Sequence, residues 1–110
     1  MAISETTQDS HIHRSTLFKV PDPENQKKLV DLYRNLEREN SKDGKPYIIK
    51  VNAGLAKDDP RSKGYTVVTH CEFASLDDMK YYDQECPAHL AIKKAAPGLG
   101  LTEPPLAVYF

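Results

Sequence analysis

Residues 65 to 73 carry the pattern that most constrains the fold, a strict alternation of side-chain character. One set of alternate positions is apolar, aromatic or small and consists of Tyr65, Val67, Thr69, Cys71 and Phe73. The other set is more polar and consists of Thr66, Val68, His70 and Glu72. Because successive side chains of a strand point to opposite faces, this pattern predicts a strand with one face against a core. The chain therefore needs a sheet with at least one covered face.

Helical segments are predicted on both sides of that strand in the sequence, and they supply the cover. The first begins at Asp22, a good N-cap that precedes Pro23. Its apolar stripe has helical spacing and consists of Leu29, Leu32, Tyr33 and Leu36. A second helix is predicted to begin after Ser75 and a third at Pro87, with Pro97 ending the last.

Three further strands are predicted, at about 11–20, at 47–51 and at about 106–110. In the second of these, Ile49 is predicted to share a face with Val51 because of the alternation. The resulting order is β-α-β-β-α-(α)-β. This order predicts an α+β, ferredoxin-like fold, a four-stranded antiparallel sheet with helices on one face.

Composition narrows the class of protein. The chain has 110 residues, with 15 Lys and Arg against 16 Asp and Glu, which predicts one domain over 11–110 after a disordered tail over 1–10. The balanced charge argues against nucleic-acid and membrane-surface partners. No apolar run is long enough for a transmembrane helix. Two cysteines, Cys71 and Cys86, are too few for a disulfide framework, so we expect a cytoplasmic protein.

The second face of the predicted sheet has no helix to cover it. Such a face meets either water or another sheet. A two-fold homodimer with sheet-on-sheet packing would cover it. From the pattern alone, both states remain open.

Four stretches resemble the stress-responsive dimeric α+β barrel domain family, in its fungal branch. They are His13–Lys19, Asp59–Thr66, Phe73–Tyr82 and Cys86–His89. The resemblance implies a homodimer of ferredoxin-like subunits, a dimeric α+β barrel. Related proteins include a plant polyketide cyclase that makes olivetolic acid and a plant hydroxynitrile lyase, so it also implies a candidate enzyme.

The resemblance assigns a general base to His89, which follows Pro87 and Ala88 as in the plant cyclase. A tyrosine upstream assists that base, and Tyr81 and Tyr82 are both candidates. Tyr82 lies seven positions before His89, one more than in the plant enzymes. A first-strand histidine of the family aligns with His13. A histidine near a helix N-terminus is favoured as the free base, which suits proton abstraction.

A small-molecule pocket is expected inside each subunit, between the helices and the sheet. Its predicted lining is Tyr33, Phe18, Val67, Met79 and Ile92. One base and a phenol oxygen donor suffice for aldol-type cyclisation or cyanohydrin cleavage beside a carbonyl. The predicted function is therefore a lyase or polyketide cyclase that needs no cofactor and no metal.

Alternative interpretations stay open at this point. The first alternative is a non-catalytic dimer that serves in stress protection or ligand binding. The second is a monooxygenase of the related barrels, in cofactor-free or haem-type form. The His11-x-His13 spacing is compatible with a metal site completed by His70 or His89. Cys86 near a helix start is a second nucleophile candidate. The acidic turn 58–61 is either a solvated turn or part of an ion pair between subunits.

Overall fold

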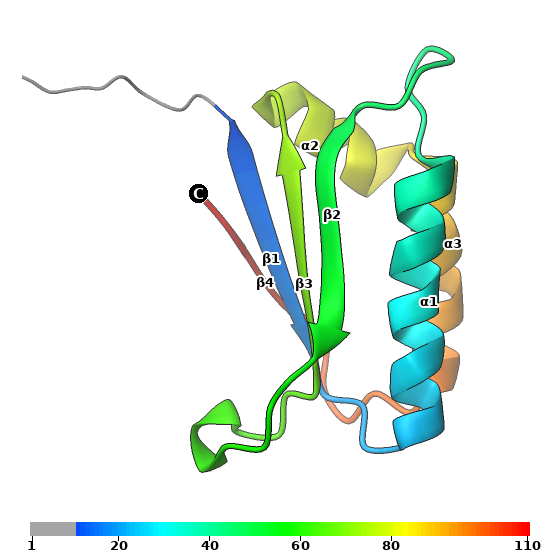
Figure 1. Ribbon diagram of the computed structural model, residues 1–110. Coiled ribbons are helices and arrows are strands. Elements are labelled where there is room, and N and C mark those ends of the chain that lie inside the picture. Colours follow the sequence, from blue (N-terminus) through cyan, green and yellow to red (C-terminus); the bar gives the residue numbers. More distant parts are fainter. Residues whose placement is uncertain (1–10) are drawn as a thin grey trace, which may run out of the picture.

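The computed structural model describes residues 11–110, a four-stranded antiparallel sheet with helices on one face (Figure 1). In chain order the elements are β1 (Ile12–Phe18), α1 (Pro23–Glu39), β2 (Ile48–Leu55), β3 (Val67–Phe73), α2 (Leu76–Gln84), α3 (Pro87–Ala95) and β4 (Leu106–Tyr109), with single 3-10 turns at Pro60–Ser62 and Ala96–Leu99. The strand order is β2-β3-β1-β4. The predicted ferredoxin-like α+β fold is confirmed. The predicted disordered tail, 1–10, lies outside the described residues.

The helices begin where the capping residues predict. The Asp22 carboxylate accepts a hydrogen bond from the Glu24 amide at 2.8 Å, and Pro23 occupies the first turn of α1. The Ser75 hydroxyl accepts from the Asp78 amide at 3.1 Å at the start of α2. These side chains satisfy amides that have no partner within the helix, so the local sequence fixes both helix starts.

Asn40 joins the end of α1 to the start of β2. Its buried Nδ2 donates to the carbonyl oxygens of Leu36 and Glu37, both at 3.0 Å. Its Oδ1 accepts from the amides of Tyr47 and Ile48 at 3.0 and 3.1 Å. The Leu36 carbonyl also accepts from the Asn40 amide, so the side chain alone satisfies the Glu37 carbonyl of the helix and two amides at the strand, where an unpaired group would be costly.

The core lies between α1, α3 and the covered face of the sheet. Leu29 and Leu36 of α1 and Val67 and Phe73 of β3 have no exposed surface. They come from the predicted apolar stripe and from the predicted inward set of the 65–73 alternation. Both periodicities are therefore confirmed by burial.

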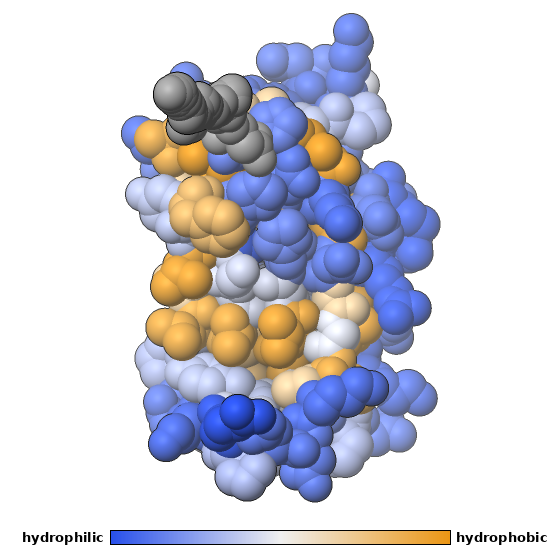
Figure 2. Space-filling view, turned by 60° about the vertical axis from the view of Figure 1, so that its left-hand side comes forward, coloured by the Kyte–Doolittle hydropathy of each residue, from blue (hydrophilic) through white to orange (hydrophobic). Residues whose placement is uncertain are grey.

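Within residues 11–110, no helix covers the other face of the sheet (Figure 1). Leu17 of β1 lies opposite Val68 of β3 and Leu106 of β4, so three apolar side chains form a row across three strands. Val108 lies beside this row on β4, and Val68, Leu106 and Val108 are 39 to 52% exposed. Apolar surface forms a band across this side in Figure 2. We call these residues and the neighbouring Phe110 the outer sheet face.

The second strand differs from its prediction in two ways. It continues to Leu55, so residues 52–55, expected in a loop, are strand. A register irregularity lies between Ile48 and Lys50. Ile49 is half exposed while Val51 is buried, so the predicted common face is wrong for Ile49. The irregularity is the reason, because an extra residue in one strand reverses the faces of those before it.

Candidate functional site

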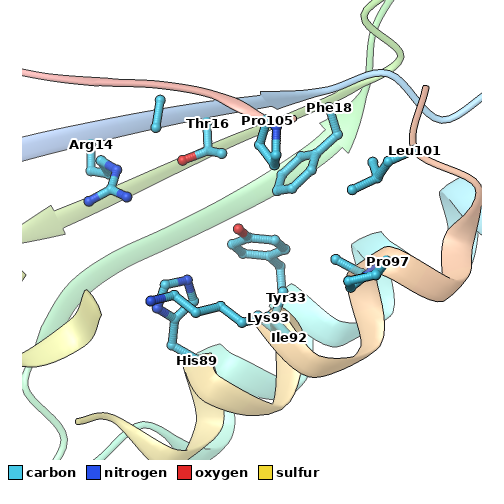
Figure 3. Close-up of a pocket in the computed structure, with 12 residues that line it drawn as sticks. Arg14, Thr16, Phe18, Tyr33, His89, Ile92, Lys93, Pro97, Leu101 and Pro105 are labelled. Carbon is cyan, nitrogen blue, oxygen red and sulfur yellow. The ribbon is translucent and has the colours of Figure 1, made fainter. Parts of the chain in front are cut away.

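A cavity of about 270 Å³ opens between β1, β4 and the α3 side of the molecule (Figure 3). Its lining residues are Arg14, Thr16, Phe18, Tyr33, His89, Ile92, Lys93, Ala96, Pro97, Leu101, Pro105 and Ala107. Most of these side chains are apolar. The cationic side chains and His89 gather at one end, away from Phe18 and Leu101 (Figure 3). The cavity therefore has the mixed character of a small-molecule site.

His89 enters the cavity from the first turn of α3. Its Nδ1 lies 2.8 Å from the backbone carbonyl oxygen of Tyr82, and a carbonyl only accepts, so Nδ1 carries the proton. Its ring stacks on that of Tyr82, with centroids 3.6 Å apart and an interplanar angle of 7°. In the neutral ring, Nε2 then holds the free lone pair. The ring is fixed on two sides and offers a base to the cavity.

Burial controls the protonation state of His89. The residue is 6% exposed. Burial, only partly opposed by the hydrogen bond to Tyr82, lowers the pKa of His89 from 6.5 to about 4. The imidazole is therefore neutral at pH 7.

Two buried tyrosines lie beside this histidine, and both stay protonated at neutral pH. Burial raises the pKa of Tyr33 to about 12, and it raises the pKa of Tyr82 as well. Tyr33 reaches from α1 into the cavity, with its hydroxyl toward the sheet (Figure 3). Tyr82 is absent from the cavity lining and supports the His89 ring from behind. Of the two, Tyr33 is thus the tyrosine that lines the cavity.

Arg14 of β1 and Lys93 of α3 form the cationic end of the cavity. Arg14 makes a two-pronged ion pair with Asp83 of α2, with N···O distances of 2.9 and 3.1 Å. Lys93 donates to the backbone carbonyl of the same Asp83. The Arg14 Nε is buried and has no hydrogen-bond partner among residues 11–110. These cations are placed by contacts to one residue, Asp83.

The model of the stress responsive A/B barrel domain family matches residues 12–99, which include the β1 and α3 sides of this cavity but not its lining residues Leu101, Pro105 and Ala107. The chain belongs to this family. A relative from Gibberella zeae, described as a fusaristatin A biosynthesis cluster protein, is 48% identical over 83 residues. That match covers 76% of this chain and 60% of the relative, so the chain spans less than two thirds of the relative's length.

Solved structures share the fold of this A/B barrel domain at low sequence identity. The hydroxynitrile lyase of Passiflora edulis is 14% identical with a TM-score of 0.72, and the match covers 94% of each chain. A Streptomyces coelicolor monooxygenase in complex with nanaomycin D is 24% identical with a TM-score of 0.65, covering 92% of this chain and 85% of its own. A dimeric ferredoxin-like protein of unknown function from Bacteroides fragilis is 22% identical with a TM-score of 0.67, covering 92% and 95%. These likenesses show the fold.

The A/B barrel domain brings four of the predicted site residues into the cavity lining. They are His89, Tyr33, Phe18 and Ile92. Val67 and Met79 were expected there too, but they are core residues that do not line the cavity. Some of the predicted lining residues therefore line the cavity, and the others pack in the hydrophobic core.

Two other predicted site residues lie away from the cavity. Tyr81 donates its hydroxyl to the Ser41 carbonyl oxygen at 2.8 Å and is absent from the cavity lining. His13 lies on the outer sheet face, where its ring stacks on those of His70 and Phe110. The structure therefore brings neither side chain beside His89.

Sequence reasoning missed Arg14, Thr16 and Lys93. The signal for the first two was present in β1, because Phe18 points into the core and side chains two and four positions earlier share its face. Family resemblance favoured His13 instead, which is one position out of phase with Phe18. Lys93 lies one turn of helix after His89, so spacing on α3 indicates it as well.

The other candidate chemistry on the chain is placed elsewhere. His11 pairs with Glu72 at 2.6 Å and His13 lies 3.2 Å from His70, on the opposite side of the sheet from His89. No group of three or more metal-binding side chains occurs within residues 11–110. The metal site considered above, with His11 and His13 as ligands and His70 or His89 completing it, is therefore not formed within residues 11–110.

The remaining alternatives have simple structural roles. Cys71 and Cys86 are free thiols with at most 2% exposure, which suits packing rather than attack on a substrate. In the acidic turn, Asp59 caps the 3-10 turn and pairs with Arg61 at 2.8 Å within the same subunit.

Within residues 11–110, no helix has the length and apolar character needed to cross a lipid bilayer.

Proposed function

We propose that this A/B barrel domain is a cofactor-independent lyase or cyclase, with His89 as general base, acting on a small molecule that contains a carbonyl group. The observation that carries the proposal is the fixed tautomer of His89. Its Nδ1 donates to a backbone carbonyl, so the neutral ring offers Nε2 to the cavity. The biosynthesis-cluster relative supports a role in making a small molecule.

An aldol-type cyclisation uses the groups present in the cavity. His89 Nε2 takes a proton from a carbon between two carbonyl groups, and the electron pair left on that carbon attacks a second carbonyl of the same molecule. One C–C bond forms and one C=O π bond breaks, which leaves an alkoxide. Tyr33 donates a hydrogen bond to that oxygen, and the imidazolium returns the proton. Loss of water then gives the ring, with no oxidant required.

The low pKa of His89 fits a base that meets an acidic carbon. A carbon between two carbonyls loses its proton more readily than an ordinary one, so a weak base is adequate. The low pKa also keeps the imidazole unprotonated at neutral pH. Tyr82 acts here as a positioning residue, since its ring and carbonyl hold the imidazole.

The working unit in this proposal is a homodimer that packs through the outer sheet face. The row of Leu17, Val68 and Leu106 offers exposed apolar surface that a second sheet would cover. A structural relative described as dimeric supports this state. The cavity lies on the other side of the sheet, so each subunit keeps its own ligand site.

The test uses the linear substrate analogue 3,5,7-trioxooctanoic acid. We expect the protein to accelerate C–C ring closure to 2,4-dihydroxy-6-methylbenzoic acid, followed by chromatography. The variant His89→Gln keeps a polar side chain of similar length but has no base, and its rate should fall to the background. Lys94→Gln, on the exposed side of α3, is the matched control. An unchanged rate in His89→Gln would contradict the proposal, and binding without acceleration would favour the ligand-binding alternative.

A further inference from the structure

We propose that Arg14 and Lys93 form an anion-binding corner of the cavity, and that the ligand is an apolar molecule carrying a carboxylate. The inference names the substrate class of the proposed function and rests on it for the identity of the site. It starts from a different observation, the hydrogen-bonding state of Arg14.

Arg14 holds donors that the protein does not use. A guanidinium has five N–H groups in a planar fork, and the ion pair of Arg14 with Asp83 uses two of them. The buried Nε has no partner within residues 11–110. A buried donor without a partner is costly, and native proteins rarely keep one without a reason. Arg14 itself lines the cavity, so a bound carboxylate would accept hydrogen bonds from the N–H groups that the ion pair leaves free there.

The charge at this end of the cavity also favours an anion. Arg14 and Lys93 contribute two positive charges, and Asp83 contributes one negative charge. His89 is neutral, so the corner keeps a net positive charge of one. Arg14 is only 16% exposed, so this charge is weakly screened by water. A carboxylate bound at this corner would bring its net charge to zero.

The remaining wall of the cavity defines the rest of the ligand. Phe18, Ile92 and Leu101 lie with prolines and alanines on the side away from Arg14 (Figure 3). These side chains offer no hydrogen bonds, so they select an alkyl or aromatic body. The ligand therefore has its carboxylate at the Arg14 end and its apolar part toward Leu101.

Such an orientation has a consequence for the base. A carboxylate held by Arg14 and Lys93 lies at the same end of the cavity as His89. A nearby negative charge favours the imidazolium and raises the pKa of the histidine. The bound anion would thus make His89 a stronger base than in the empty cavity.

A matched pair of compounds tests the corner by calorimetry. The acid 4-butylbenzoate and its neutral amide 4-butylbenzamide have the same shape and differ in charge. We expect the protein to bind the acid about tenfold more tightly than the amide, as a charge-assisted hydrogen bond would give. Failure of the acid to bind at millimolar concentration, or equal affinity for both compounds, would overturn the proposal.

Variants assign the preference to these residues. Lys93→Gln should reduce the preference several-fold, whereas the neighbouring Lys94→Gln should leave it unchanged. Arg14→Gln is combined with Asp83→Asn, because this pair removes both charges and leaves neither one buried alone. The double variant should lose most of the preference, and a preference that survives in it would overturn the assignment.

A second readout separates this inference from the proposed function. In NMR titrations of the His89 ring, the acid should raise the pKa of His89 and the amide should not. Neither binding nor this shift depends on turnover. Ligand preference without cyclisation would therefore count against the proposed function alone, and cyclisation without the preference would count against the corner alone.

Discussion

Acidification should destabilise this protein through His89, by an amount that follows from its burial. The pKa of His89 falls from 6.5 in the unfolded chain to about 4 in the folded protein. Between these values the unfolded chain binds a proton at this position and the folded chain does not. The stability present above pH 6.5 is therefore lost as the pH falls toward 4. At ~1.4 kcal/mol per pH unit, the loss is about 3 kcal/mol in the free energy of unfolding.

The variant His89→Gln isolates this contribution. Glutamine does not titrate, and every other titratable group is the same in both proteins. Urea unfolding is measured at pH 7, 6, 5 and 4 at one protein concentration, because association also affects stability. Between pH 7 and pH 4 the parent protein should lose about 3 kcal/mol more than the variant. Equal losses would refute the claim that His89 is buried in neutral form.

Three further predictions concern other parts of the structure. Asn40→Ala leaves the Glu37 carbonyl and the amides of Tyr47 and Ile48 without their side-chain partner, so urea unfolding should show a loss of about 3 kcal/mol; a loss below ~0.5 kcal/mol would contradict the role assigned to Asn40. Val68→Lys places a charge on the outer sheet face of the proposed homodimer, so light scattering should show a dimer for the parent protein and a monomer for the variant. Tyr33→Phe removes the hydroxyl donor and should lower the cyclisation rate about 100-fold, with an unchanged rate contradicting that role.

Regular patterns made most of the fold predictable. The alternation over residues 65–73 identified which side chains of β3 meet the core, and the caps at Asp22 and Ser75 placed two helix starts. These features depend on neighbours in sequence. The irregularity beside Ile49 was not predictable, because it depends on how β2 pairs with β3 across the sheet.

The candidate site was predictable in part for a similar reason. His89 was found through a local motif, and Tyr33 and Phe18 through their apolar faces. Arg14 needed the phase of β1, which Phe18 sets and which places His13 on the other face. Its significance also needed the position of Asp83, which is 69 residues away in the chain. Contacts of this kind are visible only in the folded protein.

The most direct test of the central claim is a nitrogen NMR measurement on the His89 ring at pH 7 and pH 5, with and without 4-butylbenzoate. The structure predicts a neutral ring with its proton on Nδ1 and a free lone pair on Nε2. Addition of the acid at pH 7 should leave the ring neutral, and at pH 5, closer to the pKa of about 4, it should shift the Nε2 resonance toward that of an imidazolium. A ring that is already charged at pH 7, a proton on Nε2, or an Nε2 signal that does not respond to the acid at pH 5 would contradict the account.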